Sequence, residues 1–104
     1  MQLAANGDVD KTVIAAQGAG KVIRVLTGHV NVTVAATGGG GKVALEDGAD
    51  GTRIWEASAD AVGDHIINFM PIGYPLSDNT ILNLTVDGAA TTQASARATL
   101  IAIL

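Results

Sequence analysis

Histidine, serine and acidic side chains are the groups of this chain that could take part in catalysis or bind a metal ion. His29 and His65 are its only imidazoles, and a zinc site built on them would need both close together beside a carboxylate. No nucleophile-elbow pattern surrounds Ser58, Ser77 or Ser95, so nothing in the sequence pairs a hydroxyl with a base. We therefore predict no catalytic, cofactor or metal site, and interpret the chain as a protein that is not an enzyme.

Acidic residues offer one alternative that the sequence leaves open. Asp8, Asp10 and the segment 46–50 (E-D-G-A-D) carry oxygen ligands of the kind that Ca²⁺ prefers. Their spacing differs from that of an EF-hand loop, and Asp and Gly are also ordinary turn residues. We interpret these segments as turns, with calcium binding as the alternative.

The charge balance argues against a nucleic-acid partner. Ten acidic residues outnumber six basic ones, which gives a formal net charge of −4. The basic residues are scattered, whereas phosphate binding needs grouped Lys and Arg. No apolar run approaches the roughly 18 residues of a membrane span, and the N-terminus lacks the pattern of a secretory signal. We expect a soluble protein made in the cytoplasm.

Short apolar runs separated by turn signals predict an all-β domain. Aromatic residues make up only 3% of the chain, so the core has to be built from Val, Ile, Leu and Ala, of which the β-branched members favour strands. The turn signals recur every ~8–12 residues, the spacing of a sandwich or barrel. We predict a jelly-roll-like antiparallel β-sandwich of about eight short strands. The predicted strands are Lys11–Ala16, Lys21–Thr27, His29–Thr37, Lys42–Glu46, Thr52–Ala57, His65–Met70, Thr80–Asp87 and Ser95–Leu104.

The apolar pattern changes at Gly28. Before this glycine, apolar residues occur on both faces of the strand, and after it they occupy the even positions from Val30 to Val34. A glycine inside a strand pattern often marks a bulge or bend. We predict one long strand that is broken or bent at Gly28, as happens where a strand passes from one sheet to another.

The last predicted strand, Ser95–Leu104, ends in five residues that are apolar on both faces. Successive side chains of a strand point to opposite faces, and a strand with two apolar faces must be covered on both. We expect one cover from the partner sheet and the other from a second subunit. The residues predicted to pack at this subunit interface are Leu100, Ile101, Ile103 and Leu104.

Two further segments are candidates for contacting a partner. The first is an N-terminal arm, residues 1–10, which precedes a single sandwich domain of residues 11–104 and could order on binding. The second is Pro71–Leu76, a stiff connection in which two prolines flank a glycine and the only tyrosine. The alternative for this loop is a structural role in which Tyr74 caps the end of the sandwich. The predicted contact residues are Met1, Gln2, Leu3, Ile72, Tyr74 and Leu76.

Three stretches of the sequence resemble a known group of proteins. Residues 7–26 contain G-D…T-V-I-A-A…G-A-G-K-V-I-R-V-L, residues 69–74 read F-M-P-I-G-Y, and residues 81–84 read I-L-N-L. The chain is thereby similar, from residue 7 to its C-terminus, to small jelly-roll structural modules of tailed-bacteriophage virions. It departs from their pattern at residues 38–41 and 56–64. The resemblance implies a capsid decoration (cement) protein, a head fibre or a piece of a tail fibre, commonly trimeric.

Taken together, the residues and the resemblance lead us to expect a non-enzymatic capsid decoration protein on the virion surface, made in the host cytoplasm. Its expected partners are its own copies, in a trimer by preference, and the major capsid protein, without nucleic acid, membrane or cofactor. The alternative is a carbohydrate- or receptor-binding module of a phage fibre, for which the chain offers only Trp55 and Tyr74 as sugar-stacking side chains. A metal-dependent cupin-like enzyme is a third possibility, and two histidines are too few for its site.

Overall fold

The computed structural model describes residues 2–6, 10–36, 40–87 and 95–104 of the chain. Within those ranges the backbone forms nine strands and no helix. The strands are β1 (Gln2–Asn6), β2 (Asp10–Ile14), β3 (Arg24–Val34), β4 (Lys42–Asp47), β5 (Thr52–Ser58), β6 (Gly63–Asn68), β7 (Tyr74–Pro75), β8 (Leu82–Asp87) and β9 (Ser95–Ile103).

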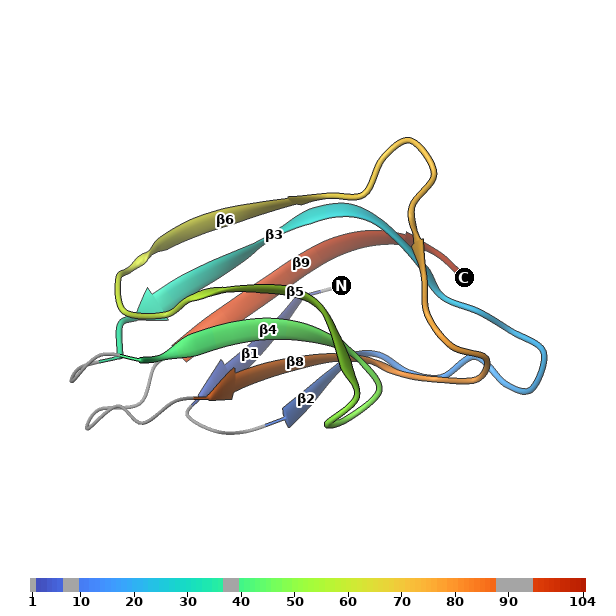
Figure 1. Ribbon diagram of the computed structural model, residues 1–104, viewed down its shortest axis with the longest axis horizontal. Coiled ribbons are helices and arrows are strands. Elements are labelled where there is room, and N and C mark those ends of the chain that lie inside the picture. Colours follow the sequence, from blue (N-terminus) through green and yellow to red (C-terminus); the bar gives the residue numbers. More distant parts are fainter. Residues whose placement is uncertain (1, 7–9, 37–39, 88–94) are drawn as a thin grey trace.

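Two antiparallel sheets pack face to face (Figure 1). The first, which we call the β9 sheet, has the strand order β1-β9-β3-β6, and the short β7 pairs with the start of β3. The second, the β4 sheet, has the order β2-β8-β4-β5. Strands that follow one another along the chain mostly alternate between the two sheets, which is the arrangement of an eight-stranded jelly roll. The predicted all-β, jelly-roll-like sandwich is confirmed.

The core between the sheets is aliphatic, as the shortage of aromatic residues requires. Alternate residues of each strand point inward, and on β3 and β4 these include Val30, Val32, Val43 and Leu45, all 0% exposed. Burying such a side chain contributes about 1.5–3 kcal/mol. The three aromatic residues lie partly buried at the margin of the core: Trp55, Phe69 and Tyr74.

Most of the predicted strands are present, with ends shifted by at most two residues. The exception is the pair of predictions around Gly28, which form the single strand β3. Strand β3 pairs with β9 along its whole length, so the idea that it passes from one sheet to the other is wrong. The phase change has a different cause. Leu26 is an extra residue between the pairs Val25↔Ala102 and Thr27↔Ile101, and a bulge of one residue shifts every later side chain to the opposite face.

Gly28 has a separate role in β3, two residues after this bulge. A Cβ atom at Gly28 would lie 2.2 Å from the carbonyl oxygen of Thr99 and 2.8 Å from the Cα atom of Leu100. The two strands therefore approach each other more closely than any side chain at this position would allow.

The N-terminal segment contains a strand that the sequence pattern does not predict. Residues 2–6 of the predicted arm form β1, which pairs antiparallel with β9 from Gln2↔Thr99 to Asn6↔Ser95. The sequence Q-L-A-A-N has little of the β-branched alternation that marks a strand, and its pairing depends on the edge that β9 presents. One edge strand of the β9 sheet thus comes from the segment that the sequence predicts to be an arm.

Candidate interaction surface

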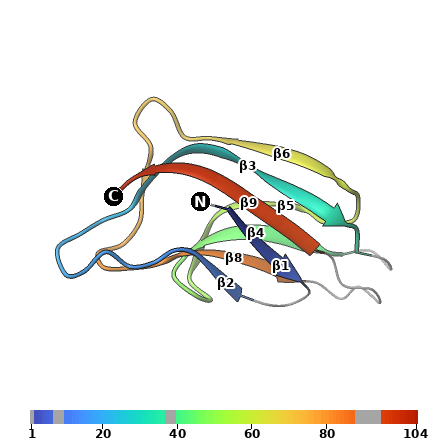
Figure 2. The same cartoon turned by 180° about the vertical axis from the view of Figure 1, so that it is seen from behind.

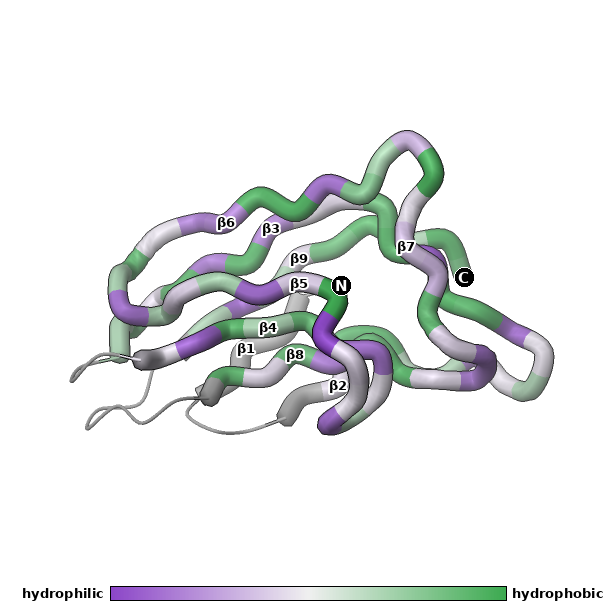
Figure 3. Tube along the Cα trace, viewed as in Figure 1, coloured by the Kyte–Doolittle hydropathy of each residue, from purple (hydrophilic) through white to green (hydrophobic). Residues whose placement is uncertain are grey.

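In its C-terminal half, strand β9 presents one apolar face to the core and a second one to the surface. Ala96, Ala98 and Leu100 point inward and are buried. Ile101 and Ile103 point outward, with exposed fractions of 61% and 56%. Figure 3 shows hydrophobic colour continuing from β9 to the C-terminus. Both faces of this half of the strand are apolar, but among the described residues only the inner face is covered.

The predicted subunit-interface residues divide between these two faces. Leu100 is 4% exposed and belongs to the core of its own chain, so its side chain has no free surface for a second subunit. The parity of the strand explains this correction, because Leu100 points to the same side as Ala98. Ile101, Ile103 and Leu104 keep exposed apolar surface, and their place in an interface stays a prediction.

The outward side chains of β9, β3 and β6 form one continuous surface, which we call the outer face of the β9 sheet. In Figure 2, which shows the molecule from behind, β9 and β1 lie in front of the β4 sheet. Strand pairing arranges this surface in rows across the sheet. The rows are Asp64, Asn31 and Arg97, then Ile66, His29 and Thr99, then Asn68, Thr27 and Ile101.

Aliphatic side chains gather toward one end of the outer face. Ile66, at 75% exposed, lies one row from Ile101, and Ile103 follows two residues further along β9. Ile103 pairs with Arg24, whose guanidinium donates a hydrogen bond of 3.2 Å to the carbonyl oxygen of Ile72 in the adjoining loop. Single exposed aliphatic residues are normal on a protein surface. Several on one face form a patch of the kind that marks an interaction site.

The loop predicted to contact a partner has both exposed and buried members. Ile72 projects from it with 75% of its surface exposed. Leu76 is 4% exposed and anchors the end of the loop in the core, which corrects its prediction as a contact residue. Tyr74 is half-buried, with its ring centroid 5.5 Å from that of Phe69. This packing supports the structural role for Tyr74 that the sequence left open.

Two of the predicted contact residues of the N-terminus belong to strand β1. Gln2 and Leu3 lie in β1, in register with Thr99 and Ala98 of β9. Met1 lies outside the described residues. Strand β1 therefore holds Gln2 and Leu3 at the edge of the β9 sheet, next to β9.

The opposite end of the outer face is polar and charged. Asn31 Nδ2 donates a hydrogen bond of 2.6 Å to Asp64 Oδ1, and His29 Nδ1 lies 3.4 Å from the same oxygen. The hydrogen bond from Asn31 holds the pKa of the Asp64 carboxyl below its ordinary value, and the imidazole of His29 adds to this effect. Asp64 is therefore ionised near neutral pH. Arg97 is exposed in the same row, two strands away.

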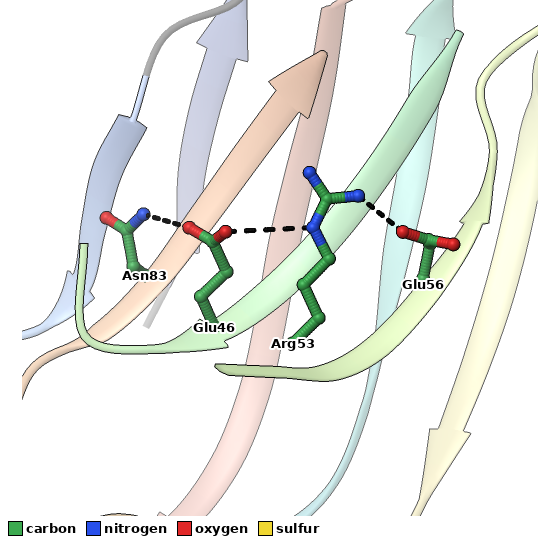
Figure 4. A network of polar contacts seen from close by, with 4 residues as sticks. All are labelled: Glu46, Arg53, Glu56 and Asn83. Carbon is green, nitrogen blue, oxygen red and sulfur yellow. Dashed lines mark hydrogen bonds and ion pairs between the residues drawn. The ribbon is translucent and has the colours of Figure 1, made fainter. Parts of the chain in front are cut away.

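A second polar cluster lies on the outer side of the β4 sheet (Figure 4). Asn83 of β8 donates a hydrogen bond of 2.9 Å to Glu46 Oε1 of β4. Arg53 of β5 lies with its Nε atom 3.7 Å from Glu46 Oε2, and its Nη1 atom donates to Glu56. Glu46 and Asn83 are only 4% and 1% exposed. The cluster links three neighbouring strands across the sheet, and its two buried members are hydrogen-bonded to each other.

The two histidines point to opposite sides of the β9 sheet. His65 pairs with the inward-facing Val30 and lies 5.8 Å from the ring of Trp55, whereas His29 points outward. They cannot share a metal ion in this arrangement. No group of three or more His, Cys, Asp or Glu residues that could hold a metal occurs in the described part of the chain.

The other predicted candidates lie in turns and loops. Asp47 accepts hydrogen bonds from the backbone amide and the hydroxyl of Ser77, the hydroxyl at 2.7 Å. Ser58 Oγ accepts one from the amide of Asp60. These contacts hold the local backbone. Within the described residues, neither hydroxyl is hydrogen-bonded to a histidine. Asp8 lies outside the described residues.

Trp55 and Tyr74, the two aromatic residues available to a sugar-binding site, are both half-buried against the chain's own core. The described residues contain no helix long and apolar enough to cross a membrane. Comparison of the chain with family models, with curated proteins and with solved structures finds no match. The arguments for a function therefore come from the residues and their arrangement.

Proposed function

We propose that this chain is a non-enzymatic structural protein of a virion, a capsid decoration protein that assembles as a small homo-oligomer, with a trimer favoured. The observation that carries the proposal is the outer face of the β9 sheet, where Ile66, Ile101 and Ile103 are each more than half exposed. The resemblance to jelly-roll modules of phage virions supports the setting, since a jelly roll is the fold that those modules share.

In this proposal, oligomer contacts and capsid contacts use different parts of the surface. The C-terminal half of β9 packs against a neighbouring copy, and the loop that carries Ile72 faces the major capsid protein. Burying each isoleucine supplies about 1.5–3 kcal/mol of gross hydrophobic free energy. Association entropy removes much of it, so several such residues per copy are needed for a stable oligomer.

The oligomer is tested by measuring mass in solution with light scattering. We expect a trimer at micromolar concentration, and dissociation toward monomer for the double variant Ile101→Thr/Ile103→Thr, because threonine keeps the strand propensity of isoleucine but not its apolar surface. The control is Val62→Thr, which changes a 64% exposed residue outside the strands. A monomeric wild-type chain would refute the oligomer.

The capsid setting needs a separate measurement. Antibody against the chain should label the outer surface of the virions that carry it in electron microscopy. Labelling restricted to the tail, or none on intact particles, contradicts a decoration protein.

A further inference from the structure

The row that contains Arg97 and Asp64 carries opposite charges on two different strands of the outer face, β9 and β6. Along this row the register reads Ala4 of β1, Arg97 of β9, Asn31 of β3 and Asp64 of β6. Neighbouring strands lie about 4.8 Å apart, so roughly 10 Å separates the β9 and β6 backbones. No ion pair between Arg97 and Asp64 is recorded within the chain.

The size of a stable interface indicates how much of the outer face an oligomer must use. The molecule measures 42 × 24 × 19 Å along its principal axes, and a stable interface buries about 800 Å² on each partner. The exposed isoleucines at one end cover too little of this face to supply that area. An interface of ordinary size therefore also covers the charged end, where a buried charge without a partner is strongly unfavourable.

We propose that the occupant of the outer face is a second copy of this chain, bound so that Arg97 of one copy pairs with Asp64 of the next. This inference rests on the proposed oligomer and specifies its geometry. If the copies are related by rotation about an axis parallel to the strands, a given row lies at the same position along that axis in every copy. The β9 side of one copy then meets the β6 side of its neighbour, a heterologous contact that closes into a ring.

The same rotation brings the apolar residues of the two sides together. Ile66 on the β6 side lies one row from Ile101 on the β9 side, so each isoleucine approaches the other across the contact. The charge pair fixes the position of one copy relative to the next along the strand direction. If one copy shifts by one row, Arg97 and Asp64 no longer face each other, and each charge is left without its partner.

Charge reversal tests this pairing directly. Arg97→Glu and Asp64→Arg should each raise the dissociation constant of the oligomer by about tenfold or more, because each places like charges together. The double variant Arg97→Glu/Asp64→Arg restores the opposite charges and should return the constant to within about threefold of wild type. Matched controls are Lys21→Glu and Asp78→Arg, which make the same charge changes at exposed residues outside the sheets and should have little effect.

Sedimentation equilibrium supplies the constants, and circular dichroism shows whether each variant folds. If a reversed variant does not fold, Arg97→Gln and Asp64→Asn remove the charge instead, and each should weaken association. A wild-type oligomer that none of these changes weakens overturns the Arg97–Asp64 contact and leaves the proposed function standing. Single variants that weaken association without rescue by the double variant also overturn it. A monomeric wild type overturns both proposals.

Discussion

Glu46 keeps a carboxylate almost fully buried on the outer side of a sheet, where an isolated charge would be unfavourable. Its two oxygens are satisfied from two directions, by the amide of Asn83 and by the guanidinium of Arg53. Because the three residues come from three adjacent strands, their contacts favour one register of the β4 sheet over its neighbours. A buried polar cluster of this kind specifies an arrangement only when each of its members is satisfied.

Removal of Glu46 should therefore destabilise the fold. We expect Glu46→Ala to lower the free energy of unfolding by about 1–3 kcal/mol, since the buried amide of Asn83 loses its acceptor. The matched control is Glu56→Ala at the exposed end of the same cluster, which should cost less than about 1 kcal/mol. Urea unfolding of both variants measures the difference. Equal effects from the two substitutions would show that burial of the cluster does not matter.

Strand β3 is the element on which the arrangement of the β9 sheet depends. It pairs with β9 on one side and with β6 and β7 on the other. The bulge at Leu26 lets Val25 and Val30 both point inward although one is odd-numbered and the other even-numbered. If Leu26 were instead paired in regular alternation, without the bulge, His29 and Asn31 would share the inward face of Val25.

The close approach of β3 and β9 at Gly28 can be tested with a matched pair of glycines. Gly28 and Gly63 have nearly the same φ, 158° and 156°, but a Cβ atom meets nothing within 4 Å at Gly63. Gly28→Ala should therefore lose about 1–3 kcal/mol more unfolding free energy than Gly63→Ala, because the added methyl forces two backbones apart. Thermal or urea unfolding gives the comparison. A difference near zero would mean that the strands separate without cost.

At the scale of the whole molecule, the outer face and the protruding loop are different segments that adjoin where Arg24, the pair of Ile103, donates a hydrogen bond to the carbonyl oxygen of Ile72. The outer face belongs to strands of one sheet, whereas Ile72 is carried by the loop between β6 and β7. The proposed function calls for a contact between copies and a contact with the capsid. In that proposal the strands of the outer face make the first contact and the loop makes the second.

Because different segments are proposed to make the two contacts, we predict that each contact can be removed independently. Ile72→Thr should leave the oligomer intact in light scattering but reduce co-sedimentation with the capsid shells that carry the protein by about tenfold, the loss expected for an apolar contact residue at the centre of an interface. Val62→Thr is again the control, because Val62 is similarly exposed in another loop. Loss of the oligomer in Ile72→Thr would instead place the loop in the contact between copies.

By itself, the sequence determined the fold class, because short β-branched runs and frequent turn residues have few ways to bury their apolar sides. It also located the apolar surface of Ile101 and Ile103, since strand alternation fixes which residues share a face. Only the tertiary structure decided that Leu100 and Leu76 are core residues and that Gln2–Asn6 form an edge strand. Those outcomes depend on which strand lies beside which.

The long-range relations between residues are a further outcome that only the tertiary structure decides. Glu46 and Asn83 form a hydrogen bond, and Asp64 and Arg97 share a row of the β9 sheet, although more than thirty residues separate the members of each pair along the chain. A single sequence shows that each residue lies in a strand, but not the register that brings two strands together. The alternation of side chains along one strand is a local property that the sequence shows. A row of residues from different strands exists only after the sheet has formed.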